Sequence, residues 1–539
     1  MVRSVASVCA AAFFCLGLGI SLSGCKKDPK TPEYWAGELD DAKRTSQKVE
    51  VLERLRTSNN LSPAMLPLLH ARLASEKAPD VKAAVAHDLG ELRDPASVKP
   101  LTDAIDWTNQ NSGAHQLDKE VAGALGKMKD PGAIPPLLRL LKIQENFTRI
   151  EAIQSLGMLR AKEAVEPLLT LVSSEETEPF VVKKAIQALG QIGDARAVPS
   201  LVRMLFADRK NMSFYPESSF ALFQIGKPAS DALVSVLKGE DRGLQSWASA
   251  HRIIEPALLS KSAQILGDLN DPRAQAPLVQ RLAYSGGAKP AEKMFVRMMA
   301  ANALGRMRSK EASGPLAGMV EENEPLVRAE YVRALTEIGD RDALAALTKS
   351  AGKGSWEARE LSIAGVGMLG TPAETAAFEK FAKDEPLLTT EGCKGADEDG
   401  CQTPDKLAQD RLRVIQSHAT PLKAASECKS DGGCWAKKLD DADVNVRRRA
   451  ALELGHLGSP DFVTPLIAHL TEKDGNTRLL VIQSVGWILE KNPGAAASAQ
   501  GALPGIKRQL EEERGRQDYV QVNEDLRRLA EKLQRAPAS

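Results

Sequence analysis

The residues with the clearest chemical potential are four clustered cysteines, Cys393, Cys401, Cys428 and Cys434. Their spacings, C-x7-C and C-x5-C, differ from the C-x2–4-C of most zinc sites and the C-x-x-C of redox pairs. An even, clustered set in an oxidising compartment is typical of disulfides. Three pairings are open, and we favour Cys393–Cys401 with Cys428–Cys434, because each pair is local in sequence. Zinc binding by these thiols is the alternative.

Two further motifs suggest ligand binding but lack the right context. Asp397–Gly400 has the acidic residues and glycine of a calcium loop, but Cys401 stands where the third oxygen ligand belongs. Gly365–Gly370 matches G-x-G-x-x-G, the motif of dinucleotide-binding turns. Such a turn follows a strand, whereas residues 357–369 are typical of a helix. We therefore predict no resident metal and no cofactor.

The seven histidines form no catalytic motif, because no H-E-x-x-H occurs and no glutamate directly follows a histidine. No G-x-S-x-G stands in the strand–turn–helix setting of a nucleophile elbow. The densest basic run, Arg447–Arg449, would spread over ~200° of a helix and so forms no patch for nucleic acid. We predict that the chain is not an enzyme, has no catalytic residue, binds no nucleic acid and has no evident small-molecule substrate.

The amino-terminal segment predicts export and lipidation. Arg3 precedes an uncharged apolar stretch, Val5–Ile20, which is too short for a spanning helix and is typical of a signal peptide. Leu22–Cys25, with the sequence Leu-Ser-Gly-Cys, resembles the bacterial lipobox. That resemblance implies cleavage before Cys25, a diacylglyceryl group on its thiol and acylation of the new amino terminus. Lys26 is not the aspartate that retains enteric lipoproteins at the inner membrane, which favours the outer membrane.

Composition narrows the class of the folded part. Of the 539 residues, 43% are hydrophobic and 26% charged, which excludes a disordered chain. Aromatic residues make up only 4%, and 71 Lys and Arg balance 71 Asp and Glu, which argues against a nucleic-acid binder. A core built mainly of Ala, Leu and Val is typical of packed helices rather than sheets.

One sequence unit recurs along the chain: a helix ending in Leu-Gly, a turn, and an apolar stretch that begins with Pro-Leu. Its clearest copies have their glycine at Gly90, Gly126, Gly157, Gly190, Gly267, Gly305 and Gly455. Glycine permits close approach of a partner helix, Asp-Pro or Gly-Asp forms the turn, and proline is tolerated where the second helix starts. Neither helix can bury its apolar face alone, so we expect the units to stack.

This unit resembles the HEAT repeat family, most clearly in Asp443-x-x-Val446-Arg447-x-x-Ala450-Ala451-x-x-Leu454-Gly455-x-Leu457. Its short period is similar to the HEAT-like repeats of phycobilin lyases, and the pattern of tetratricopeptide repeats is missing. The resemblance implies an all-α fold, a right-handed α-solenoid of stacked helical hairpins, and binding of proteins. Deoxyhypusine hydroxylase, a HEAT-like enzyme, binds iron through His-Glu motifs, which this chain lacks.

The array is interrupted between Gly367 and Gly455, where residues 390–405 are polar and rich in turn residues. Residues 239–256, with Trp247 and His251, are a second candidate insertion. The predicted segments are 1–24 (lipoprotein signal peptide), 25–39 (lipidated cysteine and tether), 40–383 (N-terminal repeats), 384–434 (cysteine-containing, disulfide-bonded insertion), 435–512 (C-terminal repeats) and 513–539 (capping helix and tail).

One column of the second helices, three residues after the proline or its equivalent, is a candidate binding surface. It consists of Asp103, Arg139, Thr170, Arg203, Ser235, Gln280, Gly318 and Ala468. A peptide groove of the armadillo type would repeat asparagine there, and a phosphate site would repeat basic residues. The mixed column favours a folded protein partner.

We therefore predict a scaffold of the bacterial cell envelope, anchored to the membrane by its lipid, that binds an unidentified protein. The alternative is an enzyme or enzyme subunit with its site at the cysteine-containing insertion. Self-association as a structural envelope protein is a third hypothesis.

Overall fold

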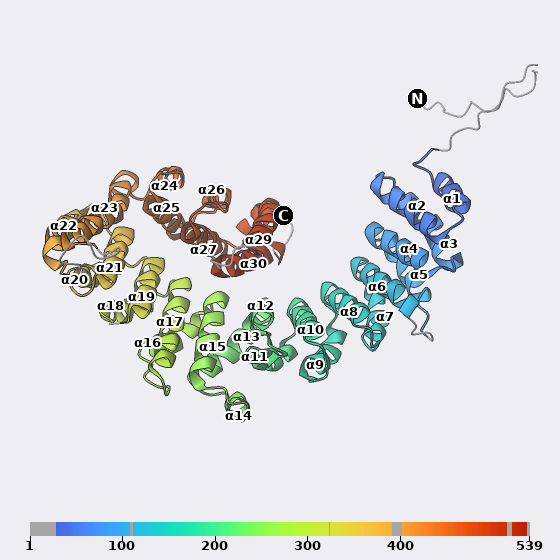
Figure 1. Cartoon of the computed structure of the whole chain (residues 1–539), viewed down its shortest axis with the longest axis horizontal. Coiled ribbons are helices and arrows are strands. Elements are labelled where there is room, and N and C mark those ends of the chain that lie inside the picture. The colour runs from blue at the N-terminus through green and yellow to red at the C-terminus, as the bar shows by residue number, and fades with distance from the viewer. Residues whose placement is uncertain (1–27, 108–111, 323, 391–401, 515–519, 536–539) are drawn as a thin grey trace, which may run out of the picture. The chain divides into compact units, whose positions relative to one another are not determined.

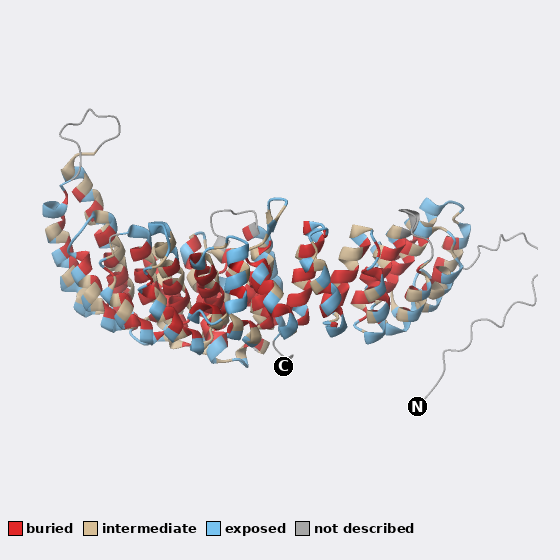
Figure 2. Cartoon of the chain, turned by 90° about the horizontal axis from the view of Figure 1, so that it is seen from below, coloured by how far each residue is buried: buried red, intermediate tan, exposed pale blue. Residues whose placement is uncertain are grey.

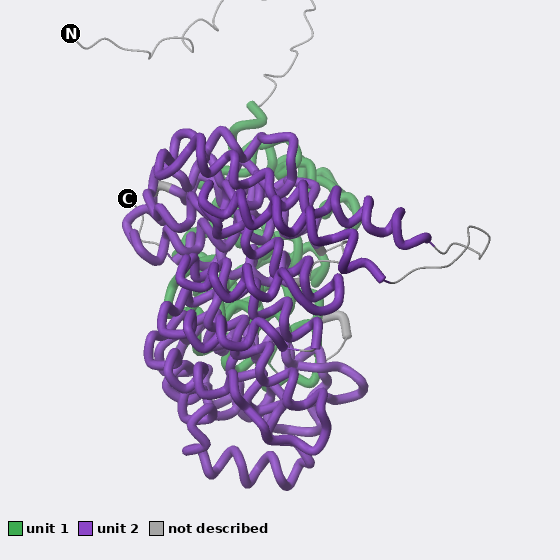
Figure 3. The backbone as a smooth tube through the Cα atoms, turned by 90° about the vertical axis from the view of Figure 1, so that its left-hand side faces the viewer, with its two compact units in different colours: residues 1–161 green, residues 162–539 purple. Residues whose placement is uncertain are grey.

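The structure is a computed structural model that describes residues 28–107, 112–322, 324–390, 402–514 and 520–535. Within these residues, regular structure is almost entirely helical, with one pair of two-residue strands. The chain divides into two compact units, residues 1–161 and residues 162–539, and each is described by itself (Figure 3). Cys25 and the signal segment lie outside the described residues.

In the first unit, long and short helices alternate along the chain and form two layers (Figure 1). The long helices α2, α4, α6 and α8 pack side by side in sequence order, and the short helices pack against them. The bounds are α1 Pro32–Asp41, α2 Thr45–Thr57, α3 Leu66–Ser75, α4 Pro79–Leu92, α5 Val98–Asp103, α6 Ser112–Lys127, α7 Ile134–Leu140 and α8 Asn146–Met158.

The second unit repeats this arrangement, with α10, α12, α15, α17, α19, α21, α23, α25 and α27 as its layer of long helices. A tight antiparallel hairpin of β1 and β2 pairs Asp208 with Ser213 and Arg209 with Met212. The bounds are α9 Val165–Ser173, α10 Pro179–Ile192, α11 Val198–Met204, β1 Asp208–Arg209, β2 Met212–Ser213, α12 Tyr215–Ile225, α13 Lys227–Lys238, α14 Arg242–Ala250, α15 Glu255–Leu269, α16 Gln275–Leu282, α17 Pro290–Arg306, α18 Ser313–Gly318, α19 Pro325–Ile338, α20 Leu344–Ala351, α21 Trp356–Leu369, α22 Thr375–Leu388, α23 Pro404–Cys428, α24 Gly432–Lys438, α25 Val444–Leu457, α26 Val463–Ala468, α27 Gly475–Lys491, α28 Ala495–Ser498, α29 Leu503–Arg514 and α30 Val520–Arg535.

The turns between the two helices of a repeat fold as short 3-10 helices. The carboxylate of Asp94 accepts the backbone N–H of Ala96, and that of Asp271 accepts the N–H of Arg273, so the aspartate satisfies a donor that the helix start leaves free. These 3-10 helices are η1 Pro63–Met65, η2 Pro95–Ser97, η3 Pro131–Ala133, η4 Lys162–Ala164, η5 Ala195–Ala197, η6 Pro272–Ala274, η7 Lys310–Ala312, η8 Arg341–Ala343, η9 Pro372–Glu374, η10 Pro460–Phe462 and η11 Ala499–Ala502.

The recurrent glycines lie where neighbouring long helices touch. A Cβ atom on Gly90 would lie 3.0 Å from the Cα of Ala124, and one on Gly267 would lie 2.7 Å from the Cα of Ala303. The helix that approaches the glycine is therefore the long helix of the next repeat. Because each repeat buries its apolar face against its neighbour, buried residues run through the helical layers, and exposed residues cover the outside (Figure 2).

The segment 384–434, which we expected to interrupt the array, is mostly helical in its described part. α23 packs between α21 and α25 in the long layer, so the stack continues through this segment. The C-terminal end of α22 and the N-terminal end of α23 extend beyond neighbouring helices of the second unit (Figure 2). A buried ion pair between Arg359 and Glu385 fastens α22 to α21, and Thr389 donates to the same carboxylate at 2.9 Å.

Candidate functional site: the inner face of the second unit

The layer of long helices in the second unit is curved, and as a result the C-terminal helices of this unit contact its earlier repeats (Figure 1). The indole Nε1 of Trp487 in α27 donates to the carbonyl of Arg306 in α17 at 2.9 Å. The side-chain amide of Asn270 donates to Glu490 at 2.6 Å, and the guanidinium of Arg535 donates to the carbonyl of Gln224 at 2.6 Å. Part of the inner face of this unit is therefore covered by the chain itself.

A buried network of alternating charges holds this contact. Arg306 of α17 lies 2.7 Å from Asp268 of α15 and 2.8 Å from Asp525 of α30. Arg528 of α30 lies 2.6 Å from Asp268 and 3.0 Å from Asp525, so each of the two arginines contacts both aspartates. Burial opposes ionisation of Asp525, but Arg306 and Arg528 outweigh it and lower the pKa of that carboxyl. Removing one member of a buried ion pair leaves the other charge uncompensated, which lowers folding stability by ~3–5 kcal/mol.

Beyond this contact, the inner face holds a cavity of about 300 Å³. Five consecutive long helices, α19, α21, α23, α25 and α27, line it. Its walls are predominantly apolar, and the half-buried side chains among them include Leu361, Met368, Leu479 and Leu480. Cavities of this size with apolar walls and a few polar groups are typical of binding sites.

The two guanidinium groups at this cavity are paired with carboxylates. Arg333 lies 2.6 Å from Glu330, and Arg448 makes a two-point contact with Asp474 at 2.8 and 2.9 Å. Although burial opposes its ionisation, Asp474 has a pKa of about 2, because Arg448 and Thr477 donate hydrogen bonds to it. The two arginines therefore give this mainly apolar cavity no free positive charge for an anionic ligand.

Glu337, also at this cavity, is a buried acid with a different environment. Burial raises the pKa of Glu337 to about 7, against the opposing charges of Arg333 and Arg306. Its Oε2 atom has no hydrogen-bond partner among the described residues. Protonation of this carboxyl therefore falls in the physiological range.

The side chain of Gln483 in α27 also lines the cavity, and it is only 7% exposed. Within the described part of the chain, neither its amide nitrogen nor its amide oxygen has a hydrogen-bond partner. A buried amide without partners costs free energy, and because both atoms are enclosed in this structure, a ligand satisfies them only after the Gln483 side chain turns into the cavity.

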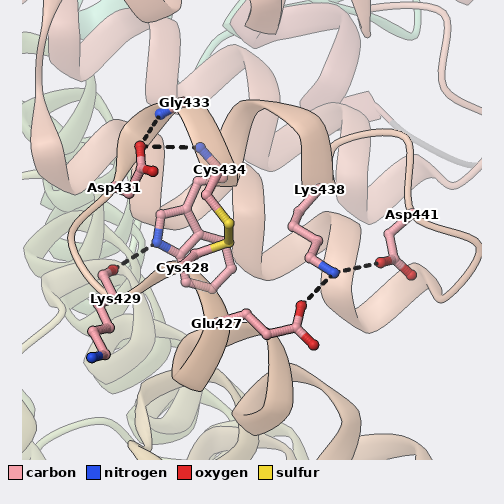
Figure 4. The surroundings of a disulfide bond; sticks show 9 residues. Glu427, Cys428, Lys429, Asp431, Gly433, Cys434, Lys438 and Asp441 are labelled. Carbon is pink, nitrogen blue, oxygen red and sulfur yellow. Dashed lines mark hydrogen bonds and ion pairs between the residues drawn. A yellow bond between two sulfur atoms is a disulfide. The ribbon is translucent and has the colours of Figure 1, made fainter.

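The predicted disulfide between Cys428 and Cys434 is confirmed (Figure 4). It joins the end of α23 to α24 with 5.2 Å between the Cα atoms. Asp431 accepts the N–H groups of Gly433 and Cys434 at 2.9 and 3.2 Å and so caps α24, and the buried ring of Trp435 donates to the carbonyl of Lys429 at 2.9 Å. The disulfide and these hydrogen bonds therefore hold α24 against the C-terminal end of α23, within the stack of repeats.

The other predicted pair, Cys393 with Cys401, lies outside the described residues, as does the calcium-like sequence Asp397–Gly400. Across the residues that the structure describes, no group of three or more His, Cys, Asp or Glu side chains could hold a metal ion. In the same residues, no helix is both long and apolar enough to cross a membrane.

The second candidate insertion forms α14 and the loop after it. Trp247 stacks on His251 with 4.4 Å between ring centroids, and the guanidinium of Arg203 lies 6.0 Å from the indole. These residues line a cavity of about 460 Å³ with Arg209 and Phe206. Arg209 donates to the carbonyl of Val172 in α9 at 2.8 Å and to that of Ser174, directly after α9, at 2.6 Å.

The column of residues that the sequence suggested as a binding surface lies mainly on short helices. The contact between the C-terminal helices and earlier repeats, and the apolar cavity, involve the long helices instead. The inner-face residues were therefore missed. One signal was available: α27 reads GNTRLLVIQSVGWILEK, with apolar residues nearly all round the helix. Such a helix is buried on more than one side.

A two-layer stack of antiparallel helical repeats is an α-solenoid, and solenoids of this kind commonly act as protein-binding scaffolds. The chain belongs to the HEAT repeat family, whose pattern matches residues 66–149, 144–211, 314–390 and 435–505, together more than half of the sequence. No curated protein matches the chain.

Solved structures with similar folds share little sequence with this chain. Yeast importin-beta (Kap95p) is 11% identical, with a TM-score of 0.40, over 92% of this chain and 73% of its own. Human deoxyhypusine hydroxylase is 21% identical, with a TM-score of 0.21, over 53% of this chain and 98% of its own. The CpcE–CpcF phycocyanin lyase of Nostoc sp. PCC7120 is 19% identical, with a TM-score of 0.26, over 60% and 99%.

Proposed function

We propose that this protein is a lipid-anchored scaffold of the bacterial cell envelope that binds another protein through its HEAT-repeat solenoid and performs no catalysis. The observation that carries the binding role is the apolar cavity on the inner face of the second unit. An open apolar surface on a repeat stack is stabilised when a partner removes it from water.

The envelope location rests on the sequence of the amino terminus. The apolar stretch Val5–Ile20 followed by Leu-Ser-Gly-Cys supports export and lipidation at Cys25, and two or three acyl chains would give stable anchoring at ~0.8 kcal/mol per buried CH2. The short polar segment after Cys25 would keep the folded part close to its membrane, and Lys26 supports the outer membrane as the destination.

Site-specific crosslinking in the native host tests the binding role. A photoreactive amino acid at Leu361, which is half-buried at the cavity, should capture a discrete protein, identified by mass spectrometry. The same group at the exposed Lys238, at the end of α13, is the control. Equal capture from both positions, or none from Leu361 when the protein is correctly located, would contradict the proposal.

Metabolic labelling with palmitate tests the anchor separately. The wild-type chain should carry label and fractionate with the outer membrane, and Cys25→Ser should lose both properties. Stoichiometric iron or zinc in the purified protein would instead support the enzyme hypothesis.

A further inference from the structure

The cavity between α19 and α27 differs from an ordinary packing defect in its chemistry. Its walls are apolar, and its guanidinium groups are already paired with carboxylates. A volume of about 300 Å³ is at the lower end of ligand sites, which suits one or two side chains better than a large cofactor. These features select an uncharged occupant with a bulky apolar group.

The side-chain amide of Gln483 indicates which polar groups the occupant of the cavity should carry. Its amide offers one acceptor and two donor hydrogens, and no described residue uses either polar atom. A backbone amide of a peptide carries one N–H and one C=O, so it can pair with both sides of this side chain. A hydrocarbon chain has neither group and would leave the glutamine unsatisfied.

A second side-chain amide stands on the same helix. Asn476 is exposed at the cavity, seven residues before Gln483 in the sequence. Seven residues span two helical turns, so the two amides lie on the same face ~10 Å apart along α27. Three residues of an extended chain also span ~10 Å. Between the two amides, Leu479 and Leu480 provide the apolar wall.

We propose that this cavity binds an extended, uncharged peptide segment of the partner protein, with a large apolar side chain in the cavity and backbone amides on Gln483 and Asn476. This inference rests on the proposed protein-binding function and specifies its partner. The segment would add apolar contacts to α19, α21 and α27 and satisfy a buried amide in the same step.

Fluorescence anisotropy with a labelled, end-blocked and uncharged pentapeptide tests the proposal on the full chain. A peptide with a central leucine should bind saturably, and replacing that leucine by serine should weaken binding at least tenfold. Gln483→Leu keeps the apolar volume but removes the amide, and it should weaken binding about fivefold or more. Gln191→Leu, on an exposed position of α10, should change nothing and is the matched control.

Leu480→Asp provides a second variant that places a charge at the cavity wall, and it should abolish binding. Thermal unfolding of every variant checks that the fold is kept. The proposal is overturned if no peptide binds, if Gln483→Leu binds as the wild type does, or if decanoate displaces the peptide at lower concentration than unlabelled peptide does. The last result would identify an acyl chain as the occupant.

The two proposals can fail separately. If crosslinking from Leu361 captures a partner but peptides do not bind, the scaffold function stands and the cavity inference fails. If peptides bind with the expected dependence on Gln483 but no cellular partner is captured, the inference stands and the scaffold function fails.

Discussion

The imidazole of His456 donates from Nε2 to the backbone carbonyl of Glu337 at 3.0 Å, linking α25 to α19 across 119 residues of sequence. The ring of His456 also lies parallel to the indole of Trp487, with 6.2 Å between centroids. Gly339, at the end of α19, faces the same imidazole so closely that a Cβ atom there would collide with it. At this contact between α19 and α25, position 339 therefore has room only for glycine.

Replacing Gly339 by alanine should disturb this contact. Gly193 is a matched control, because both glycines end a long helix with φ near +75° but Gly193 has nothing within 4 Å of a Cβ. Each substitution costs ~1–2 kcal/mol of backbone strain. Gly339→Ala should cost a further ~1–3 kcal/mol from the clash with His456. Chemical unfolding measures the difference, and equal losses would refute the contact.

The stability of the second unit should fall in acid because of His456. Burial, helped by the charge of Arg308, lowers the pKa of His456 to about 4, against 6.5 for the exposed group. Below pH ~6.5 the unfolded chain binds a proton that the folded chain does not, so stability falls until pH ~4, by up to ~3 kcal/mol. His456→Gln should flatten this decline in unfolding experiments between pH 7 and 4.

Glu337 should affect the pH dependence of stability in the opposite direction to His456, lowering stability as the pH rises. Its pKa of about 7 lies above the ordinary value of 4.5, so the folded chain keeps a proton that the unfolded chain has lost. Its contribution to stability is present below pH ~4.5 and is lost as the pH rises to ~7. Glu337→Gln should remove this loss while leaving the acid decline from His456 in place. An unchanged pH profile in that variant would show that the carboxyl is ionised in the fold.

The charge network at α15, α17 and α30 should be sensitive to truncation of one arginine. Arg306→Met leaves Asp268 and Asp525 short of a partner in a buried place and should cost ~3–5 kcal/mol. Lys227→Met, in an exposed ion pair with Asp231, should leave the free energy of unfolding nearly unchanged. Faster hydrogen exchange in α30 of Arg306→Met would locate the effect, and similar costs for both variants would contradict it.

The disulfide should contribute a small, local stabilisation. Cys428 and Cys434 are separated by six positions, and closing so short a loop restricts the unfolded chain by ~2 kcal/mol. The Cys428→Ser, Cys434→Ser double variant should lose about that amount without changing the helical content measured by circular dichroism. Non-reducing peptide mapping should recover the Cys428–Cys434 peptide, and free thiols at both positions would rule out the bridge.

The sequence by itself determined the repeat. Leu-Gly followed by Asp-Pro is a local signal, because the glycine permits helix contact and the aspartate caps the next turn, as at Gly90 and Asp94. The pairing of Cys428 with Cys434 was predictable for the same reason, since the two residues are neighbours along the chain.

Only the tertiary structure decided which residues meet on the inner face of the second unit. Small rotations between repeats accumulate over many units, so no local pattern reveals that Arg306 meets Asp525 or that His456 meets Glu337. The apolar cavity and the unsatisfied amide of Gln483 arise from helices far apart in sequence that curvature brings together. Local chemistry specifies each repeat, and the summed geometry of the repeats creates the site.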